Sequence, residues 1–258
     1  MVGTIIFVFG LLIGSFLNVC IYRLPRGTSL AFPASHCPAC GTAIPPWLNI
    51  PVASYLFLLG RCRFCRTRIS PVYPFVELLT ALLGVVLYLR FGLDLHFFVM
   101  ALLCSSLVVV TFIDLEHRII PDEISLSGIV LGFICSFFLP VPGWRDSLLG
   151  ILTGGGSLFL VAWSYERCTG KEGMGGGDIK LLAMLGAFFG WQSVPFIIFV
   201  SSLSGSVIGL TIMLVKKRDG KLAIPFGPFL VIGALTYMLF GQQIITWYLN
   251  LFNGGRPA

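Results

Sequence analysis

Long apolar runs follow one another along almost the whole of the 258-residue chain. Runs of about 20 apolar residues form α-helices that cross a hydrocarbon core ~30 Å thick. They occur at residues 3–22, 71–90, 96–114, 123–139, 147–164, 178–192, 194–215 and 227–249. The pattern therefore predicts an all-α polytopic membrane protein with about eight transmembrane helices.

The composition excludes a soluble globular domain. Hydrophobic residues make up 57% of the chain, charged residues only 11%, and the mean hydropathy is +0.95. Soluble globular domains contain a smaller fraction of apolar residues and a larger fraction of charged ones. Residues 1–22 carry no charge and lack the basic start of a cleaved signal peptide, so we expect them to remain as the first span.

Basic residues are concentrated in alternate loops. Eight spans place both termini on one side, and termini outside the cytoplasm leave four cytosolic loops: 23–70, 115–122, 165–177 and 216–226. These loops and their edges hold 14 of the 17 Lys and Arg residues, and only Arg90, Arg145 and Arg256 lie opposite. The positive-inside rule thus predicts periplasmic termini. Because membrane orientation accounts for the net charge of +6, we expect a lipid bilayer and no nucleic acid as partner.

Residues 23–70 form the only sizeable hydrophilic segment, and they contain no acidic residue. We therefore expect three parts: residues 1–22 as a first transmembrane helix, 23–70 as a small cytosolic domain, and 71–258 as a seven-helix membrane core. The apolar stretch 47–59 is too short to span. It is expected to lie on the membrane surface or to pack inside the small domain.

Four cysteines in this domain have the spacing of a zinc site. Cys37 and Cys40 form one C-x2-C pair, Cys62 and Cys65 form another, and 21 residues separate the pairs. Such pairs form tight turns that present four sulfurs to a tetrahedral ion. Two disulfides are the alternative, but a cytosolic loop is in a reducing compartment. Four protein ligands leave no position for water, so the zinc is expected to be structural.

Two aspartates lie at the ends of predicted spans. Asp114 ends the third span and Asp178 begins the sixth, which places both at the cytosolic face. A pair of carboxylates suits general acid–base hydrolysis, with one ionised and the other protonated. Asp114 could instead be an interfacial charge paired with Arg118, and Asp178 a simple N-cap.

Glycines occupy four of the five positions just before Asp178, from residue 173 to 177. A glycine run is costly to order and makes sense where a backbone comes very close, so Gly175, Gly176 and Gly177 are expected to admit substrate. For Asp122, an N-cap of the fourth span is favoured over a catalytic role. For Glu77, burial and an interfacial position are equally compatible with the sequence.

These features together resemble one known family, the bacterial prepilin leader peptidases, which are membrane aspartyl proteases of type IV pilus and type II secretion systems. The resemblance covers nearly the whole chain. Besides both C-x2-C pairs, its motifs are Gly14-Ser15-Phe16-Leu17-Asn18-Val19, Tyr22-Arg23-Leu24-Pro25, Asn49-Ile50-Pro51, Tyr73-Pro74, Glu77-Leu78, Ile113-Asp114, Ile120-Pro121-Asp122, Gly175-Gly176-Gly177-Asp178 and Ile224-Pro225-Phe226-Gly227-Pro228.

The resemblance implies that Asp114 and Asp178 are the catalytic pair, acting at the cytoplasmic face of the inner membrane. It implies prepilin or pseudopilin substrates, cut between a basic leader and a hydrophobic segment, and association with the assembly machinery. It also implies methylation of the new amino terminus with S-adenosylmethionine. The chain has no Rossmann-type glycine fingerprint, so the sequence assigns no residue to that cofactor. Two other functional classes compete with a peptidase: a transporter and a zinc-containing scaffold.

Overall fold

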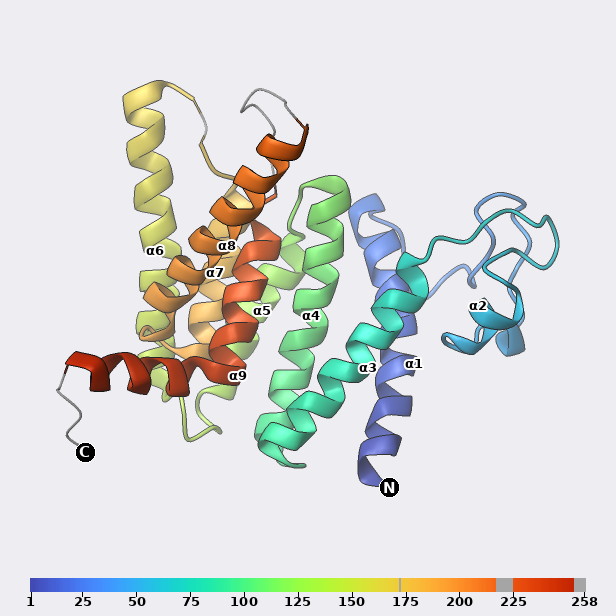
Figure 1. The fold of residues 1–258 in the computed structure, drawn as a ribbon, viewed down its shortest axis with the longest axis horizontal. Coiled ribbons are helices and arrows are strands. Elements are labelled where there is room, and N and C mark those ends of the chain that lie inside the picture. Colours follow the sequence, from blue (N-terminus) through green and yellow to red (C-terminus); the bar gives the residue numbers. More distant parts are fainter. Residues whose placement is uncertain (172, 217–224, 253–258) are drawn as a thin grey trace. The chain divides into compact units, whose positions relative to one another are not determined.

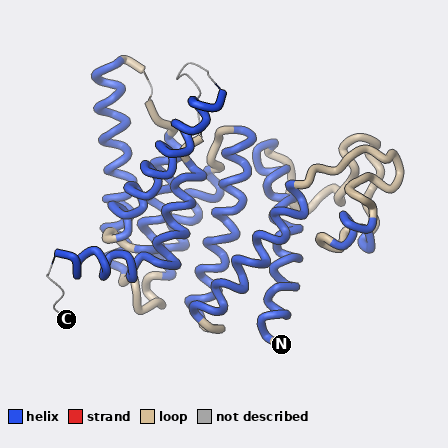
Figure 2. Tube along the Cα trace, viewed as in Figure 1, coloured by secondary structure: helices blue, strands red, loops and turns tan. Residues whose placement is uncertain are grey.

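The computed structural model describes residues 1–171, 173–216 and 225–252. It is all-helical, and these residues contain no β-strand, only two isolated bridges (Figure 2). The chain forms two compact units, Met1–His117 and Arg118–Ala258, which are taken separately below. The predicted all-α class is confirmed. Most of the expected basic loop 216–226 lies outside the described residues.

The first unit is built on three long helices: α1 (Val2–Arg23), α3 (Val72–Phe91) and α4 (Leu95–His117) (Figure 1). Helices α1 and α3 approach closely at Gly10 and Gly14. A Cβ at Gly10 would lie 2.5 Å from Cα of Ala81, and one at Gly14 would lie 2.6 Å from Cα of Glu77. The G-x3-G spacing therefore brings two backbones into contact, as small residues do between transmembrane helices.

Between α1 and α3 the chain forms a small lobe, residues 24–71, with little regular structure. It contains two 3-10 turns, Leu24–Arg26 and Pro46–Leu48, and the short helix α2 (Ala53–Phe57). Large apolar side chains of the lobe are exposed, namely Trp47, Leu56, Phe57 and Leu59. Of the two expectations for residues 47–59, this exposure favours contact with the membrane surface.

The second unit contains α5 (Asp122–Cys135), α6 (Trp144–Thr169), α7 (Gly176–Phe189), α8 (Ser193–Lys216) and α9 (Gly227–Phe252). Helix α7 is its centre, since α5, α6, α8 and α9 all contact it. Every residue from Leu181 to Phe188 is buried. A helix that is apolar on all sides and covered on all sides belongs to the core of its unit.

Helices α6 and α7 contact each other backbone to backbone. A Cβ on Gly150 would lie 2.1 Å from the carbonyl oxygen of Gly186, and one on Gly154 would lie 2.6 Å from that of Leu182. Ser147 Oγ donates to the carbonyl of Ala187 at 2.7 Å in the same seam. Glycine is required at these positions because no side chain fits between the helices.

Six of the described helices are long and apolar enough to cross a membrane: Val2–Arg26, Val72–Phe91, Leu95–His117, Trp144–Thr169, Ser193–Val215 and Gly227–Tyr248. The other two expected spans form α5 and α7, each of 14 residues. At 1.5 Å per residue they are only ~21 Å long. A helix enclosed by other helices is not held to the thickness of the lipid, so the count of eight is approximate.

Candidate active site and metal centre

The four cysteines predicted to bind a metal come together in the lobe. Two equivalent turns present them: Cys37 N–H donates to the carbonyl of Thr42, and Cys62 N–H donates to that of Thr67. All four sulfurs lie within 4.8 Å of one another. Those of Cys37 and Cys65 are 3.8 Å apart, which is the edge of a tetrahedron with metal–sulfur bonds of ~2.3 Å. The cluster therefore fits one tetrahedral metal ion.

Hydrogen bonds prepare two of the sulfurs for metal binding. The contact between Cys65 Sγ and the Thr67 hydroxyl, 3.3 Å long, helps to lower the pKa of Cys65 to about 6. The Thr42 hydroxyl makes the same 3.3 Å contact with Cys40 Sγ and lowers the pKa of Cys40. Metal ligands must be thiolates, so these threonines favour the form that binds.

The two aspartates lie where the sequence places them, at helix ends. Asp114 is in the last turn of α4 and is only 5% exposed. Asp178 is in the first turn of α7, half-buried, and its N–H donates to the carbonyl of Gly175 at 3.1 Å. Asp114 belongs to the first compact unit and Asp178 to the second.

The three glycines before Asp178 differ in their surroundings. At Gly176 a Cβ would meet nothing within 4 Å, so the chain is open there. At Gly177 a Cβ would lie 2.9 Å from Cβ of Ile120, and at Gly175 one would lie 3.5 Å from Oδ2 of Asp178. Gly177 is thus required by packing within the unit, and Gly176 leaves its approach clear.

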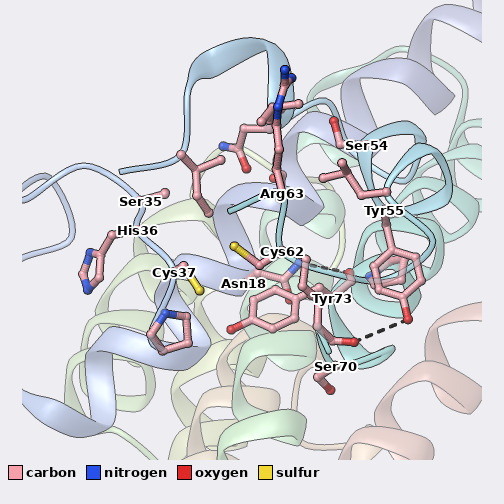
Figure 3. Close-up of a pocket in the computed structure, with 18 of the residues that line it drawn as sticks. Asn18, Ser35, His36, Cys37, Ser54, Tyr55, Cys62, Arg63, Ser70 and Tyr73 are labelled. Carbon is pink, nitrogen blue, oxygen red and sulfur yellow. Dashed lines mark hydrogen bonds between the residues drawn. The ribbon is translucent and has the colours of Figure 1, made fainter. Parts of the chain in front are cut away.

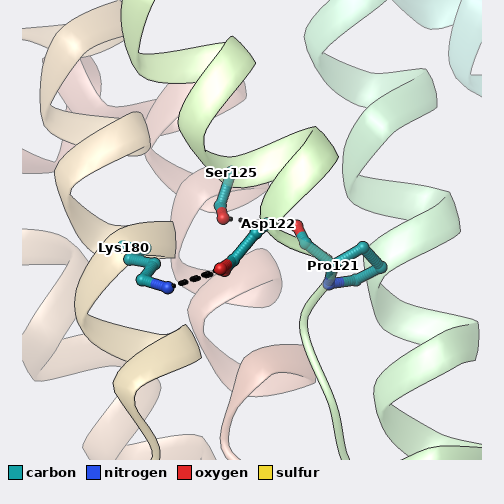
Figure 4. Close-up of polar contacts among 4 residues, drawn as sticks. All are labelled: Pro121, Asp122, Ser125 and Lys180. Atoms are coloured by element: carbon teal, nitrogen blue, oxygen red, sulfur yellow. Dashed lines mark hydrogen bonds and ion pairs between the residues drawn. The ribbon is translucent and has the colours of Figure 1, made fainter. Parts of the chain in front are cut away.

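Asp122 does not cap its helix, and that prediction is wrong. Pro121 is the N-cap of α5, and Asp122 is the first residue of the helix. Its carboxylate instead accepts two hydrogen bonds from Lys180 Nζ, at 2.7 and 2.8 Å (Figure 4). Because Lys180 is two residues after Asp178, this ion pair ties the start of α5 to the first turn of α7.

Glu77 is buried, only 8% exposed, and lines a cavity that the sequence did not predict. Its Oε2 accepts a hydrogen bond of 2.7 Å from the N–H of Val52 in the lobe. The cavity has a volume of about 440 Å³ and lies between α1, α3 and the lobe (Figure 3). Asn18 on α1 closes one side by donating to the carbonyl of Tyr73 at 3.0 Å. The only advance signal was that Glu77, Tyr73 and Asn18 all belong to the motifs quoted above.

Sequence models of two protein domains match the chain. The bacterial peptidase A24 N-terminal domain matches residues 8–91, and the type IV leader peptidase family matches residues 101–210. A prepilin leader peptidase/N-methyltransferase of Pseudomonas aeruginosa is 40% identical over 93% of this chain and 91% of the relative. This chain belongs to the type IV leader peptidase family.

Further members of the family are equally similar. A prepilin leader peptidase/N-methyltransferase of Pseudomonas putida is 40% identical over 96% of this chain and 94% of its own. A prepilin leader peptidase/N-methyltransferase of Xanthomonas campestris is 38% identical over 93% of this chain and 92% of its own. No solved structure is significantly similar to the chain. The chain covers more than nine tenths of the length of each of these relatives.

The two domain matches divide the features of this chain between them. The cysteine cluster, Glu77 and the cavity lie within residues 8–91, in the A24 N-terminal domain. Asp114, Asp178 and the glycines before it lie within residues 101–210, in the leader peptidase match. Membership in a peptidase family favours an enzyme over the transporter and the scaffold.

Proposed function

We propose that this protein removes the leader peptide from type IV prepilins or type II secretion pseudopilins and then methylates the new terminal amine. The observation that carries the proposal is the 40% identity, over 93% of the chain, to an enzyme named for both activities. We place the enzyme in the bacterial inner membrane, where it meets its substrates in the lipid bilayer and associates with the pilus or secretion assembly machinery.

In this proposal Asp114 and Asp178 catalyse the cleavage. The ionised carboxylate takes a proton from water, whose oxygen attacks the carbonyl carbon of the scissile peptide bond. The protonated carboxylate donates to the substrate as the carbon–nitrogen bond breaks. Support comes from the helix ends, since Asp114 lies in the last turn of α4 and Asp178 in the first turn of α7. The distribution of basic residues predicts that both ends lie at the cytoplasmic face. The open backbone at Gly176 supports the expected substrate approach past residues 175–177.

The four-cysteine cluster is proposed to hold one zinc ion with a structural role. The sulfur spacing fits a tetrahedral ion, and four cysteines are a ligand set typical of structural zinc. Residues 23–70 would then be a zinc-binding domain inserted between a first transmembrane helix, 1–22, and a peptidase core, 71–258.

S-adenosylmethionine is the proposed methyl donor. Methyl transfer needs an acceptor amine and a donor, whereas peptide cleavage needs two carboxylates and water. We therefore expect Asp178→Asn enzyme to methylate a pre-cleaved peptide at a rate close to that of the wild type. Mass spectrometry of the peptide, which gains one methyl group, measures this. Loss of both activities in a folded variant would mean that they share one site.

The orientation is proposed from the basic loops: termini in the periplasm and active site at the cytoplasmic face. A cysteine at Arg145, an exposed position, is expected to react with a membrane-impermeant maleimide in intact cells. A cysteine at Lys171, also exposed, is expected to react only after permeabilisation. A Cys168→Ala background removes the exposed native thiol nearest to Lys171. The reverse labelling pattern would overturn the orientation.

The direct test is mass spectrometry of a prepilin peptide before and after incubation with purified enzyme and S-adenosylmethionine. We expect loss of the leader and addition of one methyl group to the new terminus. An intact peptide in the presence of folded enzyme would refute the peptidase proposal.

A further inference from the structure

The cavity in the first unit has the size and lining of a ligand site. Its volume of about 440 Å³ falls within the ~300–1,000 Å³ of small-molecule pockets. Helices α1 and α3 line one side through Asn18, Tyr73 and Glu77, and the buried cysteines Cys37 and Cys62 line the side of the lobe. Figure 3 shows both cysteines beside Asn18 and Tyr73. The metal cluster therefore also supports one wall of the cavity.

Glu77 is the only acidic residue among the first 93 residues of the chain. A lone buried carboxylate is costly unless it has partners. Val52 N–H donates to Oε2. A carboxylate has about four acceptor positions, so it can hold this partner and a cation together.

Val52 itself has a strained backbone, with φ at 59° in a β-branched residue. Such residues rarely adopt positive φ, and strain of this kind clusters at functional sites. The hydrogen bond to Glu77 therefore holds the start of α2 over the cavity in an unfavourable conformation.

The domain matches point to what the cavity does. All its lining residues fall between Ser15 and Glu77, within the A24 N-terminal domain and outside the leader peptidase match. The relatives are named for two activities, and both proposed cleavage residues lie in the leader peptidase match. A second hollow on the lobe has no carboxylate in its lining, whereas the cavity has Glu77 beside Arg23, Arg63 and Arg68.

We propose that the cavity is where the terminal amine is methylated, and that Glu77 binds this amine and takes its proton. The inference rests on the proposed function and assigns a site to its second activity. Glu77 is the sixth residue of α3, only ~8 Å from the start of that helix, so an amine at the membrane surface can reach it.

The chemistry explains why a carboxylate is needed. A terminal amine has a pKa of ~7.7–8.0, so near pH 7 most of it is ammonium and has no lone pair with which to attack. Glu77 takes the ammonium proton, and the freed lone pair forms the nitrogen–carbon bond. S-adenosylmethionine supplies the methyl group from its sulfonium, whose sulfur–carbon bond breaks and leaves the electron pair on sulfur. Methylation leaves a cationic amine, and the proton on Glu77 passes to water, so atoms and charge balance.

The aromatic side chains of the cavity suit the positively charged donor. Tyr55 and Tyr73 line it together with Phe64, while the ring of Tyr22, also in the lining, already carries the guanidinium of Arg26. Aromatic rings attract cations through their faces, and this attraction increases away from water. The lining thus offers a carboxylate for the ammonium and aromatic rings for the sulfonium, and the exposed Arg63 and Arg68 at its edge suit the carboxylate of the donor.

The test uses full-length Glu77→Gln enzyme. Glutamine has nearly the same shape and keeps an oxygen that accepts from Val52, so the lobe is expected to stay in place. Methylation of a pre-cleaved peptide is expected to fall ~100-fold or more, the usual contribution of a general base. Leader cleavage by the same preparation is expected to stay close to the wild-type rate, since neither carboxylate of the proposed cleavage pair is changed. Glu166→Gln is the matched control, because it makes the same change at an exposed helical position.

A binding measurement completes the test without relying on activity. Wild-type enzyme is expected to bind the free-amine peptide more tightly than its N-acetylated form, and Glu77→Gln is expected to lose this preference. Normal methylation by Glu77→Gln, or parallel loss of cleavage, would overturn the inference. If wild-type enzyme fails to methylate at all, the proposed second activity fails. The role of Glu77 is then still decided by whether the wild type prefers the free amine.

Discussion

Asparagine at either Asp114 or Asp178 is expected to lower leader cleavage by roughly four orders of magnitude. Asparagine keeps the size of the side chain but cannot carry the proton that the reaction moves. Two carboxylates that share one water hold one proton between them, so either substitution disables the pair. The double variant is therefore expected to be scarcely slower than either single variant. Cleavage of a prepilin peptide, followed by mass spectrometry, measures all three.

Two comparisons separate loss of chemistry from loss of fold. Glutamate at either position is expected to restore little activity, because one extra methylene misplaces the carboxylate by ~1 Å, which can cost ~100-fold. Asp122→Asn is the matched control: its carboxylate begins a neighbouring helix but binds the half-exposed Lys180, and such pairs are worth ~1 kcal/mol or less. Well-folded Asp114→Asn enzyme that cleaves near the wild-type rate would refute the two-aspartate mechanism.

Serine at Cys37 or Cys62 is expected to release the metal and unfold the lobe. A structural zinc contributes ~10–16 kcal/mol of binding energy, which is also folding energy for the segment around it. The lobe has little else to stabilise it, since its helix α2 has five residues and its large apolar side chains are exposed. Metal analysis is expected to fall from roughly one zinc per chain to none. Limited proteolysis is expected to cut within residues 24–71.

Cys168→Ser is the control for this experiment, because Cys168 is an exposed cysteine outside the cluster. It is expected to keep its zinc and its resistance to protease. Because Cys37 and Cys62 line the cavity, methylation is expected to fall with the metal, whereas Asp114 and Asp178 lie outside the lobe. Freshly purified protein without zinc, or with its four thiols paired as disulfides, would refute the metal site.

Features set by a repeating local pattern could be predicted from the sequence. Apolar runs predicted the helices, because a helix in lipid must satisfy its backbone internally and present apolar side chains outward. The C-x2-C pairs predicted the cluster, because each pair needs only a tight turn, and the expected cytosolic position favoured a metal over disulfides. The positions of Asp114 and Asp178 at helix ends followed from the same apolar runs.

Features set by contacts distant in sequence could not be predicted. Asp122 binds Lys180, 58 residues away, and no local pattern distinguishes this from capping. Glu77 accepts from Val52 across 25 residues, so its burial depends on how the lobe folds back. The end of α7 was predicted at residue 192, three residues too late, because the helix ends where Gly190 adopts φ 80°.

The glycine seam between α6 and α7 has a consequence for motion. With Gly150 against Gly186 there is no layer of side chains between the two backbones that could rearrange. We therefore expect α6 and α7 to unfold as one unit. The amides of residues 181–188 then exchange with solvent only when the whole unit opens, which makes them its most slowly exchanging segment. Asp178 is one turn before that segment and two residues after Gly176, where the backbone has open space around it. We therefore expect its carboxylate to be held by the most slowly exchanging segment of its unit while the backbone before it stays accessible.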